Sequence, residues 1–307
     1  MSFSTDIKEE LCRIRVKGEE QRRALLAGLT QTCASLRLSR TPQVFYQSES
    51  ASVVRLIAQL VGSLYALDAT SARREQEHRK APLSVVTFSG ADCRKLLVDA
   101  GVLSEQAGAL SFIKQIPAAL VSDPECRRAF LRGAFLGSGS CSDPASGYHL
   151  EIVCRTDAFA EELVQQIGSL GPVAKRTERK GRDIVYLKGD DVAGFLALTG
   201  ASAAALAFEN ARTERDFRNY INRTSNCETA NIGKTVAAGL QQLSAIEAIE
   251  RHMPLTDLPA PVYEAARLRL QYPDATLQEL ADLAEIGKSG MNHRLARLIR
   301  IAKELEP

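Results

Sequence analysis

Apolar residues recur along this chain at two spacings, and each spacing predicts a different element. Alternating β-branched and aromatic residues bounded by Gly, Pro and Ser predict strands at residues 43–47, 83–88, 148–154 and 184–187. Apolar residues three and four positions apart predict helices at residues 53–67, 91–100, 158–170 and 192–198. Strands and helices therefore alternate, which predicts an α+β fold for this part of the chain.

The order of these elements occurs twice. Residues 25–30 (LLAGLT) resemble residues 130–135 (FLRGAF), 105 positions further on, and two strand–helix passes follow each. Gly28 and Gly133 lie inside these apolar helical patterns, where glycine costs about 1 kcal/mol relative to alanine. Glycine is accepted there when two helices approach closely, so we predict that the two helices pack about a pseudo-two-fold axis. Two unrelated glycine-containing helices are the alternative.

A basic stretch precedes the last strand of each half. On one side of a two-fold sheet, two basic hairpins would form a positively charged saddle for a DNA backbone, although a charged hairpin is often only a solvated loop. The basic residues are Arg73, Arg74, Arg79 and Lys80 in the first half and Lys175, Arg176, Arg179, Lys180 and Arg182 in the second.

The C-terminal part has the pattern of a helix-turn-helix. A proline-spaced link at residues 253–261 leads to a helix at 262–271, and a second helix begins at Thr276 with Glu279 completing a capping box. We expect Ser289 to cap the third helix. Its apolar positions are Met291, Leu295, Leu298 and Ala302. The turn glycine, Gly287, comes later than in the commonest helix-turn-helix spacing.

The opposite face of the third helix is polar and basic, as in a recognition helix. We expect base readout through Asn292, His293 and Arg297. The expected backbone contacts are Lys288, Ser289, Arg294 and Arg300, and Thr276 is a further candidate for contact with DNA. A three-helix packing domain with a solvated basic face is the alternative.

Residues 26–29 (LAGL) and 131–139 (LRGAFLGSG) resemble the LAGLIDADG motif of homing endonucleases. Together with residues 218–227 (RNYINRTSNC) and the C-terminal pattern, they make the chain similar to the WhiA family of sporulation and cell-division regulators. The resemblance implies a pseudo-two-fold LAGLIDADG-like body at residues 1–200, in halves of about 1–105 and 106–200. A helical connecting region at 201–253 and a helix-turn-helix domain at 254–307 follow.

In homing endonucleases an acidic residue near the end of each motif binds Mg²⁺. The matching positions here hold Cys33 and Ser138, and neither supplies the anionic oxygen that Mg²⁺ requires. Asp143 is a conceivable substitute, but before Pro144 it is better explained as a turn residue. The resemblance therefore implies a catalytically inactive body, with no metal and no cofactor.

We thus expect a sequence-specific regulator that binds double-stranded DNA and acts in cell division, chromosome segregation or sporulation. The alternatives are an active LAGLIDADG endonuclease and a scaffold that binds a transcription or division protein. Arg218 and Arg223 are further backbone candidates, although bracing a helix junction explains their segment slightly better.

The amino-acid composition excludes only a few classes of protein. Lys and Arg total 39 against 37 Asp and Glu, so the net charge of +2 alone does not argue for nucleic acid. Seven cysteines without a C-x-x-C pair argue against a disulfide framework and a zinc site. A polar N-terminus and the lack of a long apolar run predict a cytoplasmic protein with no membrane contact, and the expected DNA binding would associate it with the nucleoid. No small-molecule substrate is evident, since Gly233-Lys234-Thr235 lacks the earlier glycine of a phosphate-binding loop.

Overall fold

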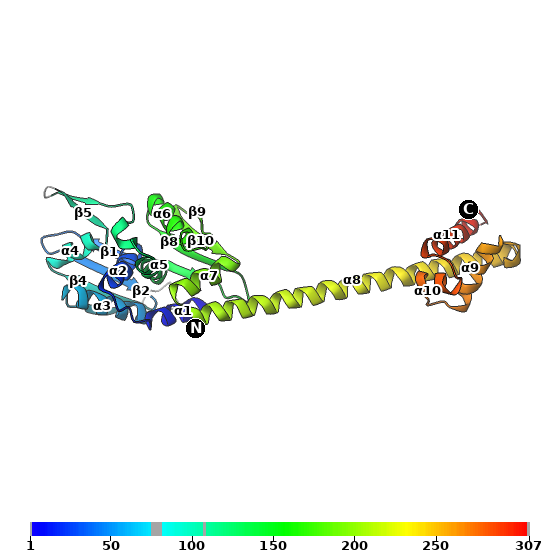
Figure 1. Cartoon of the computed structure of the whole chain (residues 1–307), viewed down its shortest axis with the longest axis horizontal. Helices are drawn as coiled ribbons and strands as arrows, with labels where there is room; N and C mark the ends of the chain where they lie inside the picture. Colours follow the sequence, from blue (N-terminus) through cyan, green and yellow to red (C-terminus); the bar gives the residue numbers. More distant parts are fainter. Residues whose placement is uncertain (1, 75–81, 107–108, 306–307) are drawn as a thin grey trace. The chain divides into compact units, whose positions relative to one another are not determined.

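The computed structural model describes residues 2–74, 82–106 and 109–305 (Figure 1). Arg79 and Lys80 lie outside the described residues. The chain forms two compact units, Met1–Arg215 and Asp216–Pro307, whose boundary falls within one helix. The predicted combination of an α+β body and an all-α C-terminal region is confirmed.

The first half of the body is a four-stranded antiparallel sheet with helices on one face. Its strands β1 (Ala34–Arg37), β2 (Gln43–Ser48), β3 (Thr70–Arg74) and β4 (Leu83–Ser89) follow the order β1-β2-β4-β3. Its helices are α1 (Phe3–Cys12), α2 (Glu19–Cys33), α3 (Ala51–Tyr65) and α4 (Asp92–Asp99). The helix-covered face of this sheet carries the buried residues Val44, Tyr46, Val86 and Phe88. Val44 is paired with Phe88 and Tyr46 with Val86, and residues that are paired or two positions apart share a face.

The second half repeats this topology, which confirms the predicted repeat. A hairpin of β5 (Leu103–Gln106) and β6 (Ala109–Phe112) and the short 3-10 helix η1 (Ala118–Val121) connect the halves. The second sheet has the order β7-β8-β10-β9, with β7 (Gly139–Cys141), β8 (His149–Cys154), β9 (Lys175–Arg179) and β10 (Arg182–Lys188). Its helices are α5 (Pro124–Ser138), α6 (Asp157–Gly168) and α7 (Asp190–Thr199).

The helices α2 and α5 pack side by side at the centre of the body (Figure 1). Gly28 of α2 meets the backbone of α5, and Gly133 of α5 meets the backbone of α2, as the repeat predicted. One continuous hydrophobic core joins both halves through these helices. The ends of α2 and α5, at Cys33 and Ser138, therefore lie between the two sheets.

The second unit is all-helical. The helix α8 (Ser202–His252) runs across the boundary between the units, and the 3-10 helix η2 (Leu255–Asp257) and α9 (Ala260–Gln271), α10 (Leu277–Leu283) and α11 (Lys288–Leu305) follow. Two small cores hold it together: Ile246, Ile249, Val262 and Leu298 belong to one, and Leu268, Leu280, Met291 and Leu295 to the other. In the described part of the chain, no helix has both the length and the apolar character required to span a membrane.

The turn before α11 differs from expectation at the start of the helix. The helix begins at Lys288, so Ser289 lies in its first turn and is not its cap. The Gly287 carbonyl already accepts the hydrogen bond from the Met291 N–H, so the helix begins one residue before Ser289. The left-handed residue of the turn is Glu285, with φ of 52°, and not Gly287. The capping box of Thr276 and Glu279 at α10 is confirmed.

Candidate nucleic-acid interface

The two faces of α11 have opposite character. Met291, Leu295, Leu298 and Ala302 are buried against α9 and α10, as predicted. His293, Arg297 and Arg300 are exposed and lie four and three residues apart, so they share the face turned away from that core. The exposed Ser289 lies on the same face, while exposed Lys288 and Asn292 lie on one flank. Five Lys and Arg residues against one Glu make α11 strongly basic.

Arg294 lies on the other flank of α11 and is only half-buried. Its guanidinium donates to Glu264 Oε2 of α9 at 2.6 Å, so it braces α11 against α9. This ion pair occupies one nitrogen of the guanidinium. A contact of Arg294 with DNA stays a prediction that depends on the remaining donors.

The loop that leads into α10 is held by a buried arginine that sequence reasoning missed. Arg269 is 3% exposed, and its Nε donates to Gln242 Oε1 of α8 at 2.8 Å. Its Nη1 donates to the carbonyl oxygens of Pro273 and Ala275 at 3.0 and 2.7 Å. Burial lowers the pKa of Arg269. Thr276 follows this loop, so Arg269 fixes where α10 begins.

The surface beside α10 is acidic. Asp274, Glu279 and Asp282 line a shallow hollow with Tyr272 and Leu283, and α10 contains no basic residue. Thr276 is exposed, but its hydroxyl and backbone N–H already bond Glu279. A polyanion would be repelled from this side and attracted to the exposed face of α11.

In the body, the basic stretch of the second half is the hairpin of β9 and β10. Arg179 is paired with Arg182, and Lys175 with Tyr186, so these side chains share the face that no helix covers. Lys180 and Gly181 form the two-residue turn, both with positive φ. Arg179 also contacts Glu151 Oε1 at 3.3 Å. Lys175, Arg179, Lys180 and Arg182 are all exposed and on or beside one open surface.

Arg176 does not belong to that surface, which corrects the expectation that the whole stretch faces one way. It is paired with buried Val185 and so points to the helix-covered face. There it donates to Asp183 Oδ1 at 2.9 Å and to Glu161 Oε1 at 2.7 Å. The hydrogen bond to Asp183 raises the pKa of Arg176.

The described part of the first half's basic stretch is Arg73 and Arg74 of β3. Arg73 is paired with Ser84, on the helix-covered side of its sheet, whereas Arg74 is paired with Leu83 on the open side. Both are exposed. Arg37 lies over the ring of Phe45, its neighbour on the open side. Among the described residues of this stretch, only Arg74 therefore lies on the open side.

The two positions that match the nuclease acids lie at the ends of α2 and α5. Cys33 Sγ donates to the Leu29 carbonyl, and burial raises the pKa of this thiol to about 12. Ser138 Oγ donates to the Val153 carbonyl at 2.7 Å. Asp143 accepts the Ala145 N–H and shapes its own turn, as expected. A thiol that stays protonated and a hydroxyl engaged with a carbonyl are poor ligands for Mg²⁺.

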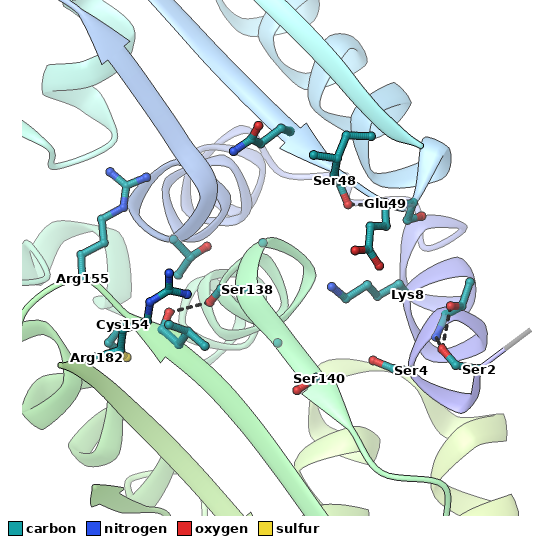
Figure 2. Close-up of a pocket in the computed structure, with 18 residues that line it drawn as sticks. Ser2, Ser4, Lys8, Ser48, Glu49, Ser138, Ser140, Cys154, Arg155 and Arg182 are labelled. Atoms are coloured by element: carbon teal, nitrogen blue, oxygen red, sulfur yellow. Dashed lines mark hydrogen bonds between the residues drawn. The ribbon is translucent and has the colours of Figure 1, made fainter. Parts of the chain in front are cut away.

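A cavity of about 760 Å³ opens beside Ser138, between the two sheets and α1 (Figure 2). Basic side chains from three segments reach it: Lys8 of α1, Arg155 after β8, and Arg182 of β10. Glu49 lines it too. Sequence reasoning missed Lys8 and Arg155, since each is an isolated basic residue outside any basic stretch or motif.

Arg218 and Arg223 lie on α8 in a stretch where every side chain is exposed. The same stretch exposes Phe217, Tyr220 and Ile221. Their exposed position on α8 tests neither of the two predicted roles. Contact with phosphate and bracing of a helix junction both stay predictions.

Comparison with known proteins identifies both units. Residues 127–218 match the family model of the WhiA LAGLIDADG-like domain, and residues 221–302 match that of the WhiA C-terminal HTH domain. The "Probable cell division protein WhiA" of Heliobacterium modesticaldum is 39% identical over 310 residues, covering 99% of this chain and 96% of that protein. Its namesake from Clostridium novyi is 35% identical over 312 residues, covering 99% and 98%.

Solved structures show the same fold. Full-length WhiA from T. maritima matches with a TM-score of 0.62 and 24% identity, covering 99% of both chains. The N-terminal LAGLIDADG domain of WhiA matches with a TM-score of 0.53 and 21% identity, covering 65% of this chain and 90% of that one.

Proposed function

This chain belongs to the WhiA family, and from that premise we propose that it is a sequence-specific DNA-binding regulator whose specificity comes from α11. Its relatives bear the name of probable cell division proteins, and we propose a role in controlling genes of cell division, chromosome segregation or sporulation. Such a protein would reside with the chromosome in the cytoplasm.

One observation carries the proposal: α11 exposes His293, Arg297 and Arg300 along one face, over an opposite face that is buried. An arginine on such a face can donate two hydrogen bonds to the O6 and N7 atoms of guanine in the major groove. His293 and Asn292, one turn nearer the N-terminus, would contact neighbouring bases. Lys288, Ser289 and Arg300 would contact phosphates on either side.

The acidic surface beside α10 supports the same orientation. Because Asp274 and Asp282 repel phosphate, the duplex would approach from the α11 side. Thr276, at the start of α10, would then contact a phosphate through its hydroxyl proton. Arg294 would act mainly by holding α11 on α9 through Glu264.

The body would add affinity without base readout. Lys175, Arg179, Lys180 and Arg182 form the open basic surface, and we propose that they contact the DNA backbone. Arg74 would contribute from the first half. Contacts of this kind are independent of sequence and weaken steeply with salt.

We further propose that the body does not cleave DNA. Cys33 stays protonated because its pKa is raised by burial, and Ser138 carries no charge, so the two motif ends offer no anionic oxygen to a Mg²⁺ ion. Incubating the protein with supercoiled plasmid and Mg²⁺ tests this. We expect the plasmid to remain supercoiled. The proposal would be overturned if the protein produced linear plasmid and a mock purification did not.

The test of DNA reading uses fluorescence anisotropy with a site selected from a duplex library. Arg297→Ala should weaken binding to that site by about 1–3 kcal/mol while changing binding to random duplex much less. Arg267→Ala is the matched control, since Arg267 is an exposed arginine on α9, outside the proposed interface. Equal behaviour of the two variants would contradict the assignment of α11.

A further inference from the structure

The cavity beside Ser138 collects positive charge from segments far apart in the sequence. Among the residues that the structure describes, Lys8, Arg155 and Arg182 line it, against a single carboxylate, Glu49. Figure 2 shows the Lys8 amine extending into the space between α1 and the end of α5, with Ser138 across from it. A hollow with such an excess of positive charge attracts anions more strongly than the same residues would on a flat surface.

Two of these cations are partly removed from water. Burial lowers the pKa of Lys8 and that of Arg155, because desolvation makes each charge costly, and the neighbouring Glu49 carboxylate offsets part of that cost at Lys8. Arg155 offsets part of that cost by donating to the Ala34 carbonyl. An anion in the cavity would offset more of it, because a desolvated charge gains most from a nearby opposite charge.

The remaining wall of the cavity supplies neutral donors. The N-cap residue Ser2 and the first-turn residues Ser4 and Thr5 line it, so the amino-terminal end of α1, with its positive partial charge, borders the cavity. Ser140 adds a hydroxyl group from the opposite side, where the Ser138 hydroxyl already donates to the Val153 carbonyl. Cations, hydroxyls and a helix N-terminus around one space are the groups that bind the oxygens of a phosphate.

We propose that this cavity binds a phosphate group without a metal ion, through Lys8, Arg182 and the hydroxyls between them. Two sources present this chemistry: a free phosphate compound such as a nucleotide, or a phosphate of the DNA backbone. The volume of about 760 Å³ accommodates a diphosphate or a nucleotide. The proposal does not depend on base reading by α11, because a free phosphate compound requires no DNA.

The test uses the full-length protein and three variants, Lys8→Met, Arg182→Met and Lys17→Met. Methionine keeps the aliphatic part of each side chain. Lys17 is an exposed lysine near α1 that does not line the cavity, so Lys17→Met is the control for the loss of one positive charge. Circular dichroism checks that each variant folds. Because Arg182 is exposed at the start of β10, Arg182→Met keeps the test valid if Lys8→Met fails to fold.

Calorimetric titration with inorganic pyrophosphate in EDTA tests the free source. Anisotropy on random duplex at low salt, without pyrophosphate, tests the DNA source. For a free phosphate compound we expect pyrophosphate affinity to fall about tenfold or more in Lys8→Met and Arg182→Met, but not in Lys17→Met. For DNA, pyrophosphate would not bind and the same two variants would weaken duplex binding. If both variants match Lys17→Met in both assays, the proposal is wrong.

Discussion

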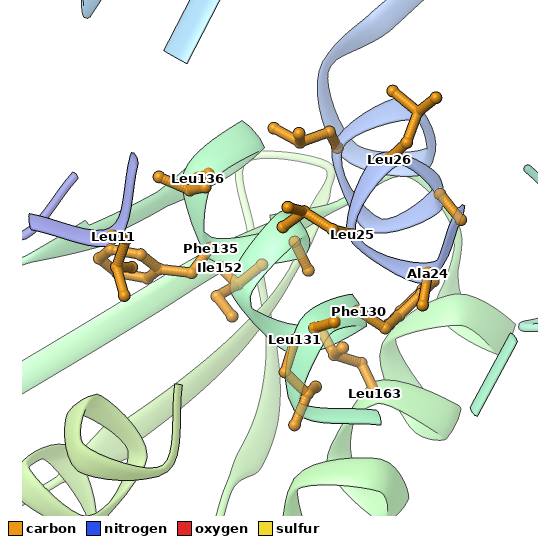
Figure 3. Close-up of a cluster of buried hydrophobic side chains, with 14 of the residues drawn as sticks. Leu11, Ala24, Leu25, Leu26, Phe130, Leu131, Phe135, Leu136, Ile152 and Leu163 are labelled. Atoms are coloured by element: carbon orange, nitrogen blue, oxygen red, sulfur yellow. The ribbon is translucent and has the colours of Figure 1, made fainter. Parts of the chain in front are cut away.

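Gly28 and Gly133 are in contact through their backbones at the centre of the body. A Cβ on Gly28 would lie 2.2 Å from the Phe130 carbonyl oxygen, and a Cβ on Gly133 would lie 2.1 Å from the Leu25 carbonyl oxygen. Figure 3 shows the side chains around this contact, including Leu25, Leu26, Phe130 and Leu131. Neither helix can accept a methyl group here unless the two halves separate.

Gly28→Ala should therefore destabilise the body by about 3 kcal/mol, at the upper end of overpacking effects, because the obstructing atoms belong to backbone. Gly168→Ala is the control, since Gly168 lies in helix α6 with nothing within 4 Å of an added Cβ. There alanine should stabilise by about 0.5–1 kcal/mol. Urea denaturation of each variant gives both values. A Gly28→Ala variant as stable as the parent would show that α2 and α5 are not packed this closely.

Glu285 provides a prediction of the opposite sign. Its φ of 52° places a residue with a Cβ in the left-handed region, between α10 and α11. Replacing it by glycine should raise the stability of the helix-turn-helix by about 1 kcal/mol relative to Glu285→Ala. The comparison with alanine removes the effect of losing the carboxylate. Thermal melts decide it, and an alanine variant that melts above the glycine variant would contradict the turn geometry.

Arg269→Met should both destabilise the second unit and weaken DNA binding. It leaves the Pro273 and Ala275 carbonyls and the Gln242 side chain without their donor, at a cost of about 1–3 kcal/mol for each group that stays buried. Because the loop before Thr276 would loosen, affinity for a selected site should fall as well. Arg267→Met, at an exposed position on α9, is the control for both readouts. Stability unchanged in Arg269→Met would refute the anchoring role.

Thiol chemistry tests the environment of Cys33. Burial raises its pKa from 9.0 to about 12, so between pH 7 and 10 the native protein keeps it as the unreactive thiol. Cys227 is exposed. Iodoacetamide followed by mass spectrometry should modify Cys227 first, and labelling of Cys33 should stay low at pH 10, where an ordinary thiol is mostly ionised. Labelling of Cys33 that rises with pH as a free thiol does would contradict its burial.

Sequence patterns predicted the central elements of the body better than its edges. Strands β2, β4, β8 and β10 are rich in β-branched and aromatic residues and bury alternate positions over most of their length, because one face of each is covered by helices. The edge strand β9 (KRTER) is exposed at every position, so nothing in its composition signals a strand. For the same reason, composition alone does not show which basic residues of this stretch share a face. The strand period separates Lys175 from Arg176, placing them on opposite faces.

The candidate site shows a similar division. The buried positions of α11 follow directly from their spacing, and the exposed basic positions then lie opposite. The ion pair of Arg294 with Glu264 and the cavity around Lys8 depend on segments brought together only by the fold. No local pattern contains that information. The start of α11 at Lys288 and the left-handed conformation of Glu285 depend on how the turn closes. Ser289 and Gly287, a common helix cap and a common turn residue, do not indicate either feature.

The central claim is that α11, and not the LAGLIDADG-like body, reads the DNA sequence. It is tested most directly by comparing His293→Ala/Arg297→Ala with Lys175→Met/Arg179→Met in the full-length protein. Affinities for a selected site and for random duplex are measured at two salt concentrations. We expect the α11 variant to lose the preference for the selected site, whereas the body variant keeps that preference and has a shallower salt dependence. If the body variant loses the preference and the α11 variant retains it, specificity resides in the sheets and the account is wrong.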